Sequence, residues 1–345
     1  MRLATIIALI LSIIMSAAAS EISPPPVPEA GERLMPEADS FGEGLIQILE
    51  DIIPLVRPDL HEASKVCIGL LGTVLLASLI QSTSEQIRAT INIAAAAGIS
   101  SAMLLNVKSL IHLAGDTITE MTEYGKLLLP VMTTALAAQG GIGSSAALYA
   151  GTAAVNSFIS SLISKLLLPA VYIFIAVGIA MAATGEEMLK KFKELIKTLI
   201  TWILKTVLSV FTAYMGITGV ISGTTDAAAL KVTKATISSV VPVVGGILSD
   251  ASEAVIVGAG VMKSAVGVSG LLVVLAIWIS PFLQIGIQYL LLKATGGLCG
   301  VFGIKGASVV IEDFAKAMGF LLAMTGAVCF ILLISVVCFM KGMGT

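Results

Sequence analysis

The stretch MGFLLAMTGAVCFILLISVVCFM, residues 318–340, contains no charged side chain. A helix needs about 20 apolar residues to cross the hydrocarbon core of a bilayer, so this stretch predicts a transmembrane helix. Further apolar segments precede it, at about 66–80, 89–107, 127–165, 166–184, 200–222, 239–262 and 268–292. The pattern predicts an all-α, polytopic membrane protein with about five to seven transmembrane helices.

The composition of the 345-residue chain argues against most other classes of protein. Hydrophobic residues make up 57% and charged residues 12%, whereas soluble domains carry about 25% charged residues. The sequence has no P-loop, no HExxH motif and no cluster of metal ligands, and its four cysteines lie in or beside apolar runs. We therefore expect no enzyme, no cofactor, no metal site and no nucleic-acid partner.

The N-terminus has the order of a secretory signal peptide. Arg2 precedes an apolar stretch from Leu3 to Met15, and the small residues 17–20 follow it. We expect residues 1–20 to be cleaved; the alternative is an uncleaved anchor. Residues 21–62 hold ten acidic and two basic residues, so we expect an exported acidic linker, followed by a short amphipathic helix that ends near Pro54 on the membrane surface. Residues 63–345 form the predicted membrane domain.

Four prolines indicate an internal repeat within this domain. Pro130 and Pro169 have the same spacing as Pro242 and Pro281, so one constant offset superimposes the first pair on the second. The predicted repeat units are about 86–184 and 198–296, with 318–340 as a final helix. Transporter folds often contain such repeats, and chance spacing of the prolines is the alternative.

Each predicted unit contains a segment that spans a membrane poorly. Polar residues interrupt the apolar runs at 139–145 and at 250–253, and we expect a re-entrant helical hairpin at each place. Acids flanked by apolar runs suggest an ion or substrate path, although a solvated surface loop is the alternative for 250–253. The candidate pathway and gate residues are Asp250, Glu253, Pro242, Gly245, Gly246, Gln139 and Pro130.

A basic amphipathic segment, 186–200, precedes the predicted span at 200–222. The positive-inside rule places its lysines in the cytoplasm. One interpretation is an interfacial helix; the other is a docking site for a cytoplasmic partner such as a motor ATPase. The candidate docking residues are Lys190, Lys191, Phe192, Lys193 and Lys197.

Two stretches resemble a known family: GITGVISGTTDAAALK at 216–231 and VPVVGGILSD at 241–250. On these residues the chain is similar to the stage III sporulation protein AE family of endospore-forming bacteria. The resemblance implies a multi-pass protein of the mother-cell membrane around the forespore. It also implies membership of a channel complex with the other stage III sporulation A proteins, including a secretion-ATPase-like subunit, and an indirect contact with stage II sporulation protein Q.

From the residues and the resemblance together we expect a permease-like membrane subunit of this channel complex. The paired hairpins would form its gate and membrane lipid would surround it. One alternative is an independent secondary transporter with a site at the hairpins. The other is a structural membrane scaffold for the complex.

Overall fold

The computed structural model describes residues 24–38, 40–83, 88–138, 142–217, 265–302 and 305–343, and every element within them is a helix. Six described stretches are long and apolar enough to cross a membrane. They comprise α3 (Phe41–Thr83), α4 (Arg88–Ala138), α5 (Ile142–Leu162) with α6 (Leu168–Thr184), α7 (Glu187–Ile217), α10 (Ala265–Val301) and α11 (Lys305–Met343). The prediction of an all-α chain with several membrane-length helices is confirmed.

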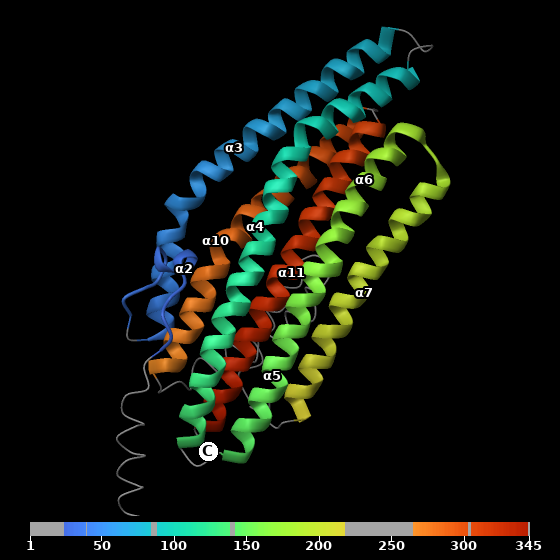
Figure 1. Ribbon diagram of the computed structural model, residues 1–345. Coiled ribbons are helices and arrows are strands. Elements are labelled where there is room, and N and C mark those ends of the chain that lie inside the picture. Colours follow the sequence, from blue (N-terminus) through green and yellow to red (C-terminus); the bar gives the residue numbers. More distant parts are fainter. Residues whose placement is uncertain are drawn as a thin grey trace, which may run out of the picture.

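The long helices form an elongated bundle in which three pairs of helix ends meet at one end (Figure 1). This hairpin end holds the C-termini of α3, α6 and α10 and the N-termini of α4, α7 and α11. Gly185 ends α6 there with a left-handed φ of 71°, and its N–H bonds to the Met181 carbonyl. A π-helical segment, η2 (Ile163–Leu167), joins α5 to α6.

The C-terminal helix α11 runs through the centre of the bundle (Figure 1). It contacts α4, α5, α6, α7 and α10, and its most apolar window is completely buried. Glycines let neighbouring helices approach it: a Cβ on Gly125 of α4 would lie 2.6 Å from a Leu332 methyl group. The run that predicts membrane insertion most strongly is therefore shielded by protein.

The helix predicted to end near Pro54 does not end there. Instead α3 continues through Pro54 and Pro58 to Thr83, because Ile48, Ile52 and Val56 form one buried stripe against α10 on both sides of the first proline. With α2 (Glu29–Glu32), the first half of α3 packs on α10. The predicted boundary at residues 62 and 63 therefore falls inside one helix.

The first predicted hairpin also differs from the structure. Its arms, 127–138 and 146–163, are parts of longer helices, because α4 begins at Arg88 and α5 continues through η2 into α6. The polar stretch 108–126 is helical because Ile111, Ala114, Ile118 and Met121 place a buried face at helical spacing. The second predicted hairpin, Pro242 and the predicted signal peptide lie outside the described residues.

Candidate functional site

The predicted docking residues lie at the start of α7, near the hairpin end of the bundle. Lys190 and Lys191 are exposed and Phe192 is 46% exposed. Lys197 is half-buried and pairs with Glu194 at 2.9 Å. Lys193 differs from the other lysines, because it is only 4% exposed. It is therefore not part of the exposed surface to which the sequence interpretation assigned it.

Lys193 forms a buried ion pair with Asp313 of α11. The Lys193 Nζ lies 2.6 Å from Asp313 Oδ2, and the two side chains are 6% and 4% exposed. The Lys316 Nζ lies 3.3 Å from the other carboxylate oxygen, Oδ1. Gly178 of α6 makes room for the carboxylate, since a Cβ there would lie 2.7 Å from Oδ2. The Lys193–Asp313 ion pair thus joins α7 to α11 at a point where α6 also packs closely against Asp313.

Sequence reasoning did not identify Asp313. Two signals were available in the sequence. Asp313 precedes the most apolar run of the chain, 318–340, and Lys193 lies in helical register with the apolar residues Ile200, Leu204 and Phe211. Buried charges in membrane proteins are paired and are often functional. Because α7 also carries the predicted docking residues, the pair connects the exposed start of α7 to the central helix.

Unpartnered polar atoms surround α11 further along the bundle. Among the described residues, four buried polar atoms have no hydrogen-bond partner: the Tyr124 hydroxyl, Asn156 Oδ1, Trp278 Nε1 and Gln288 Nε2. The Asn156 amide nitrogen lies 2.8 Å from the Cβ position of Gly125, which also meets Leu332 of α11. We call Tyr124, Asn156 and Trp278 the polar layer. A buried polar group without a partner destabilises the folded state by about 1–3 kcal/mol, so the layer calls for a functional explanation.

All three members of the polar layer come from helices that contact α11. Tyr124 belongs to α4, Asn156 to α5 and Trp278 to α10. The Trp278 ring centroid lies 6.5 Å from that of Phe330 on α11.

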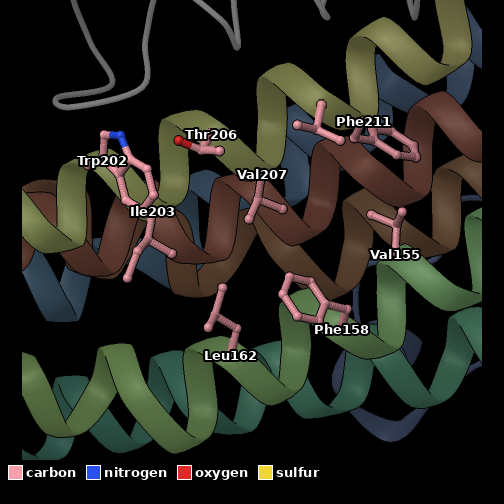
Figure 2. Close-up of a pocket in the computed structure, with 9 residues that line it drawn as sticks. Val155, Phe158, Leu162, Trp202, Ile203, Thr206, Val207 and Phe211 are labelled. Carbon is pink, nitrogen blue, oxygen red and sulfur yellow. The ribbon is translucent and has the colours of Figure 1, made fainter.

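A groove of about 350 Å³ lies between α5 and α7. Figure 2 shows Phe158 and Leu162 of α5 facing Ile203 and Val207 of α7 across it. The surface that these residues present is apolar. The groove can accommodate hydrocarbon, and it offers no charged group that would position a polar solute.

The predicted gate residues are mostly outside the part of the chain that the structure describes. Pro130 lies inside α4 and is half-buried. Gln139, Pro242, Gly245, Gly246, Asp250 and Glu253 lie outside the described residues. Their roles remain predictions.

Comparison with known proteins identifies the family. The family model described as "Stage III sporulation protein AE" matches residues 39–342. The chain belongs to this family. A curated stage III sporulation protein AE from Bacillus subtilis (strain 168) is 23% identical over 175 residues. That match covers 51% of this chain and 44% of the relative, less than half the relative's length. No solved structure matches.

Membership in the stage III sporulation protein AE family applies to the whole helical bundle. The matched range begins before α3 and includes all but the last residue of α11. The buried ion pair and the polar layer both lie within it. The sequence-based recognition of the family is thereby confirmed.

Proposed function

We propose that this protein is a permease-like integral membrane subunit of the channel complex between mother cell and forespore during endospore formation. The observation that carries the proposal is the family match across a bundle with six membrane-length helices. On this proposal the protein lies in the mother-cell membrane around the forespore. Its partners are the other stage III sporulation A proteins, with stage II sporulation protein Q as an indirect partner.

The distribution of charge supports an orientation with the hairpin end in the cytoplasm. Arg88, Lys190, Lys191 and Lys305 lie within a few residues of the helix ends that meet there. Acidic residues dominate the first half of α3, which begins at the opposite end. Six crossings would then leave both the start of α3 and the end of α11 on the exported side, as expected after a signal peptide.

In the proposed mechanism, the central helix α11 closes the pathway at rest. The polar layer supports this role, because its polar atoms have no hydrogen-bond partner among the described residues while α11 is in place. The exposed start of α7 would receive the secretion-ATPase-like subunit. The Lys193–Asp313 pair would then transmit a movement of α7 to α11, since it is the described ion pair between these two helices.

The test is conservative removal of the polar layer in a native spore-former. Tyr124→Phe combined with Trp278→Phe removes two polar atoms that have no partner among the described residues. Because the smaller ring at position 278 leaves a cavity beside Phe282 and Phe330, the thermal unfolding of the variant in nanodiscs is measured beside the spore counts. We expect heat-resistant spore counts to fall at least about tenfold at unchanged membrane abundance. Tyr172→Phe is the control, because Tyr172 is 41% exposed. Unchanged counts in the double variant would favour the scaffold interpretation.

The independent secondary transporter is tested separately. Purified protein that moves a solute in liposomes without its partners, and loses this activity in Asp250→Asn with Glu253→Gln, would support the transporter. Dependence of transport on the ATPase-like subunit would support the channel complex. In the native host, unchanged sporulation of the same double variant would assign the two acids to a solvated loop.

A further inference from the structure

The groove between α5 and α7 exists because these two helices pack on the central helix more than on each other. Helix α5 packs on α4 and α11, and α7 packs on α6 and α11. At one end of the groove, the Tyr214 hydroxyl of α7 donates to the Ala147 carbonyl of α5 at 3.2 Å. Gly151 leaves room for the Tyr214 ring, because a Cβ there would lie 2.7 Å from a ring carbon. Tyr214 thus closes this end of the groove.

The groove has a buried floor and exposed rims. Of the residues that line it, Ile203 and Phe211 are 9% and 1% exposed, so they form the floor. Phe158 is 58% exposed, and Trp202 and Val210 are each 63% exposed, so they form the rims. The lining surface is apolar, whereas an ordered water molecule needs about two to four polar partners. The groove therefore favours an apolar occupant over water.

The width of the groove limits what can lie in it. On α7 the lining extends from Trp202 to Phe211, and the nine residues between these positions rise about 13.5 Å. Division of the volume of about 350 Å³ by this length gives a mean cross-section of about 26 Å². A helix about 10 Å in diameter has a cross-section of about 79 Å². A partner helix could insert only single side chains, whereas one extended hydrocarbon chain fits along the whole groove.

A second copy of this chain would not fill the groove either. A two-fold symmetric dimer presents the same surface from both subunits, so a groove on the dimer axis would face the same groove of the other subunit. The rims formed by Phe158, Trp202 and Val210 would meet, and the space above the two floors would stay empty. Close packing disfavours such an interface.

The surroundings of the groove supply a suitable chain. The groove lies between two of the six stretches that are long and apolar enough to cross a membrane, Ser145–Thr184 and Glu187–Tyr214. Residues 206–217 of α7 contain no charged residue. The groove length of about 13.5 Å is also close to half of the hydrocarbon thickness of about 30 Å. This is the depth that the acyl chains of one leaflet occupy.

We propose that the groove binds one acyl chain of a membrane phospholipid. The chain would pass between Phe158 and Val207, which face one another across the groove (Figure 2), and would fill the space that α5 and α7 leave open. It would thereby hold α7, which carries the predicted docking residues at its start, against the rest of the bundle. The proposal rests on the insertion of α5 and α7 in a membrane and not on the role in the channel complex.

Trp202 is a natural reporter for this site, because it lines the groove. The sequence has two tryptophans, and the other, Trp278, packs against Phe282 and Phe330. The assay uses the full chain in nanodiscs of phosphatidylcholine, a small fraction of which carries bromine on its acyl chains. Bromine quenches tryptophan fluorescence on contact, and the Trp202→Phe variant gives the background from Trp278. We expect strong quenching of Trp202 in the wild-type protein.

Two variants obstruct the groove without adding a polar group. Val207→Phe narrows it from the half-buried wall, and Val210→Phe narrows it from the exposed rim, where a larger side chain leaves the buried core unchanged. Each should reduce the quenching of Trp202 about twofold or more. Leu105→Phe on α4 is the control, because Leu105 is 80% exposed and lies outside the groove. Native mass spectrometry after detergent exchange should find one retained phospholipid on wild type and on the control, and about tenfold lower occupancy on the obstructed variants.

Four results would overturn the proposal. The first is equal quenching and equal lipid retention in wild type and in both obstructed variants. The second is quenching of Trp202 by aqueous acrylamide but not by brominated lipid, which would place the groove in water. The third is protection of Trp202 from both quenchers, which would mean that protein covers the groove. The fourth is a disulfide-linked dimer through Phe158→Cys in native membranes, which would make a second copy the occupant.

Discussion

Removing the charge of Asp313 should destabilise the protein more than removing that of Lys193. Both side chains are almost fully buried, and breaking a buried pair by removing one partner costs about 3–5 kcal/mol. The two variants are not equivalent, because Asp313 keeps Lys316 at 3.3 Å when Lys193 is lost. Lys193 forms its ion pair within the described chain with Asp313, so Asp313→Asn leaves a buried ammonium group without this counter-ion.

The assay is the midpoint of thermal unfolding in nanodiscs for a small set of variants. We expect the order wild type, Lys193→Met, Asp313→Asn from most to least stable. The pair Lys193→Met with Asp313→Leu should recover most of the loss, because well-packed apolar residues can replace a buried ion pair at little cost. Lys197→Met is the control: its exposed pair with Glu194 contributes about 1 kcal/mol or less.

The function of the pair can be separated from its contribution to stability. If the apolar pair folds and assembles normally but heat-resistant spores are lost, the charges act in the mechanism. Equal midpoints for wild type and Asp313→Asn would refute the reasoning from burial. A larger loss in Lys193→Met than in Asp313→Asn would refute the role given to Lys316.

Three other sets of variants test the packing. Gly178→Ala should displace Asp313 and destabilise the protein by about 1–3 kcal/mol, whereas Gly98→Ala, which meets nothing within 4 Å, should be neutral or slightly stabilising in the same unfolding assay. Cys329 is completely buried, so maleimide should label it only after denaturation; rapid labelling of the resting protein would contradict the central position of α11. Leu76→Cys should resist a membrane-impermeant maleimide, because its 64% exposed side chain lies in the apolar segment 66–80 that we expect to cross the membrane; labelling from either side would contradict that expectation.

The sequence was sufficient to predict the class of fold and the family. Runs such as 318–340 are too long and too apolar for another interpretation. The described helices include the predicted apolar segments 66–80, 89–107, 166–184, 268–292 and 318–340, together with residues 200–217 of the segment 200–222. The limits of the helices were harder to predict. Pro54 suggested the end of a helix, and the polar residues 108–126 separate the predicted apolar segments 89–107 and 127–165, but Pro54 and 108–126 both lie inside long helices. Tertiary packing against α10 and α11 outweighed the local preference there.

The candidate site was predictable only in part, because the predicted and observed site residues lie in different regions. The acids at 250 and 253 attracted attention because apolar runs flank them. Asp313 instead precedes an apolar run, as helix-end residues commonly do, so its burial depends on α6 and α7 packing around it. The polar layer has no local signal, since Tyr124, Asn156 and Trp278 come from three helices and share only their proximity to α11.

Lys193 shows why the register of a long helix matters. Taken alone, residues 186–200 have an apolar face centred near Phe192, which leaves Lys193 among polar neighbours. In the structure α7 continues to Ile217, and its packing face is set by the later residues Ile200, Leu204 and Phe211, all buried. Phe211 follows Lys193 by five full turns of an α-helix, so the two side chains lie on the same face. One continuous helix has one register, so burial of Phe211 turns Lys193 inward, where only a carboxylate such as Asp313 can offset its charge.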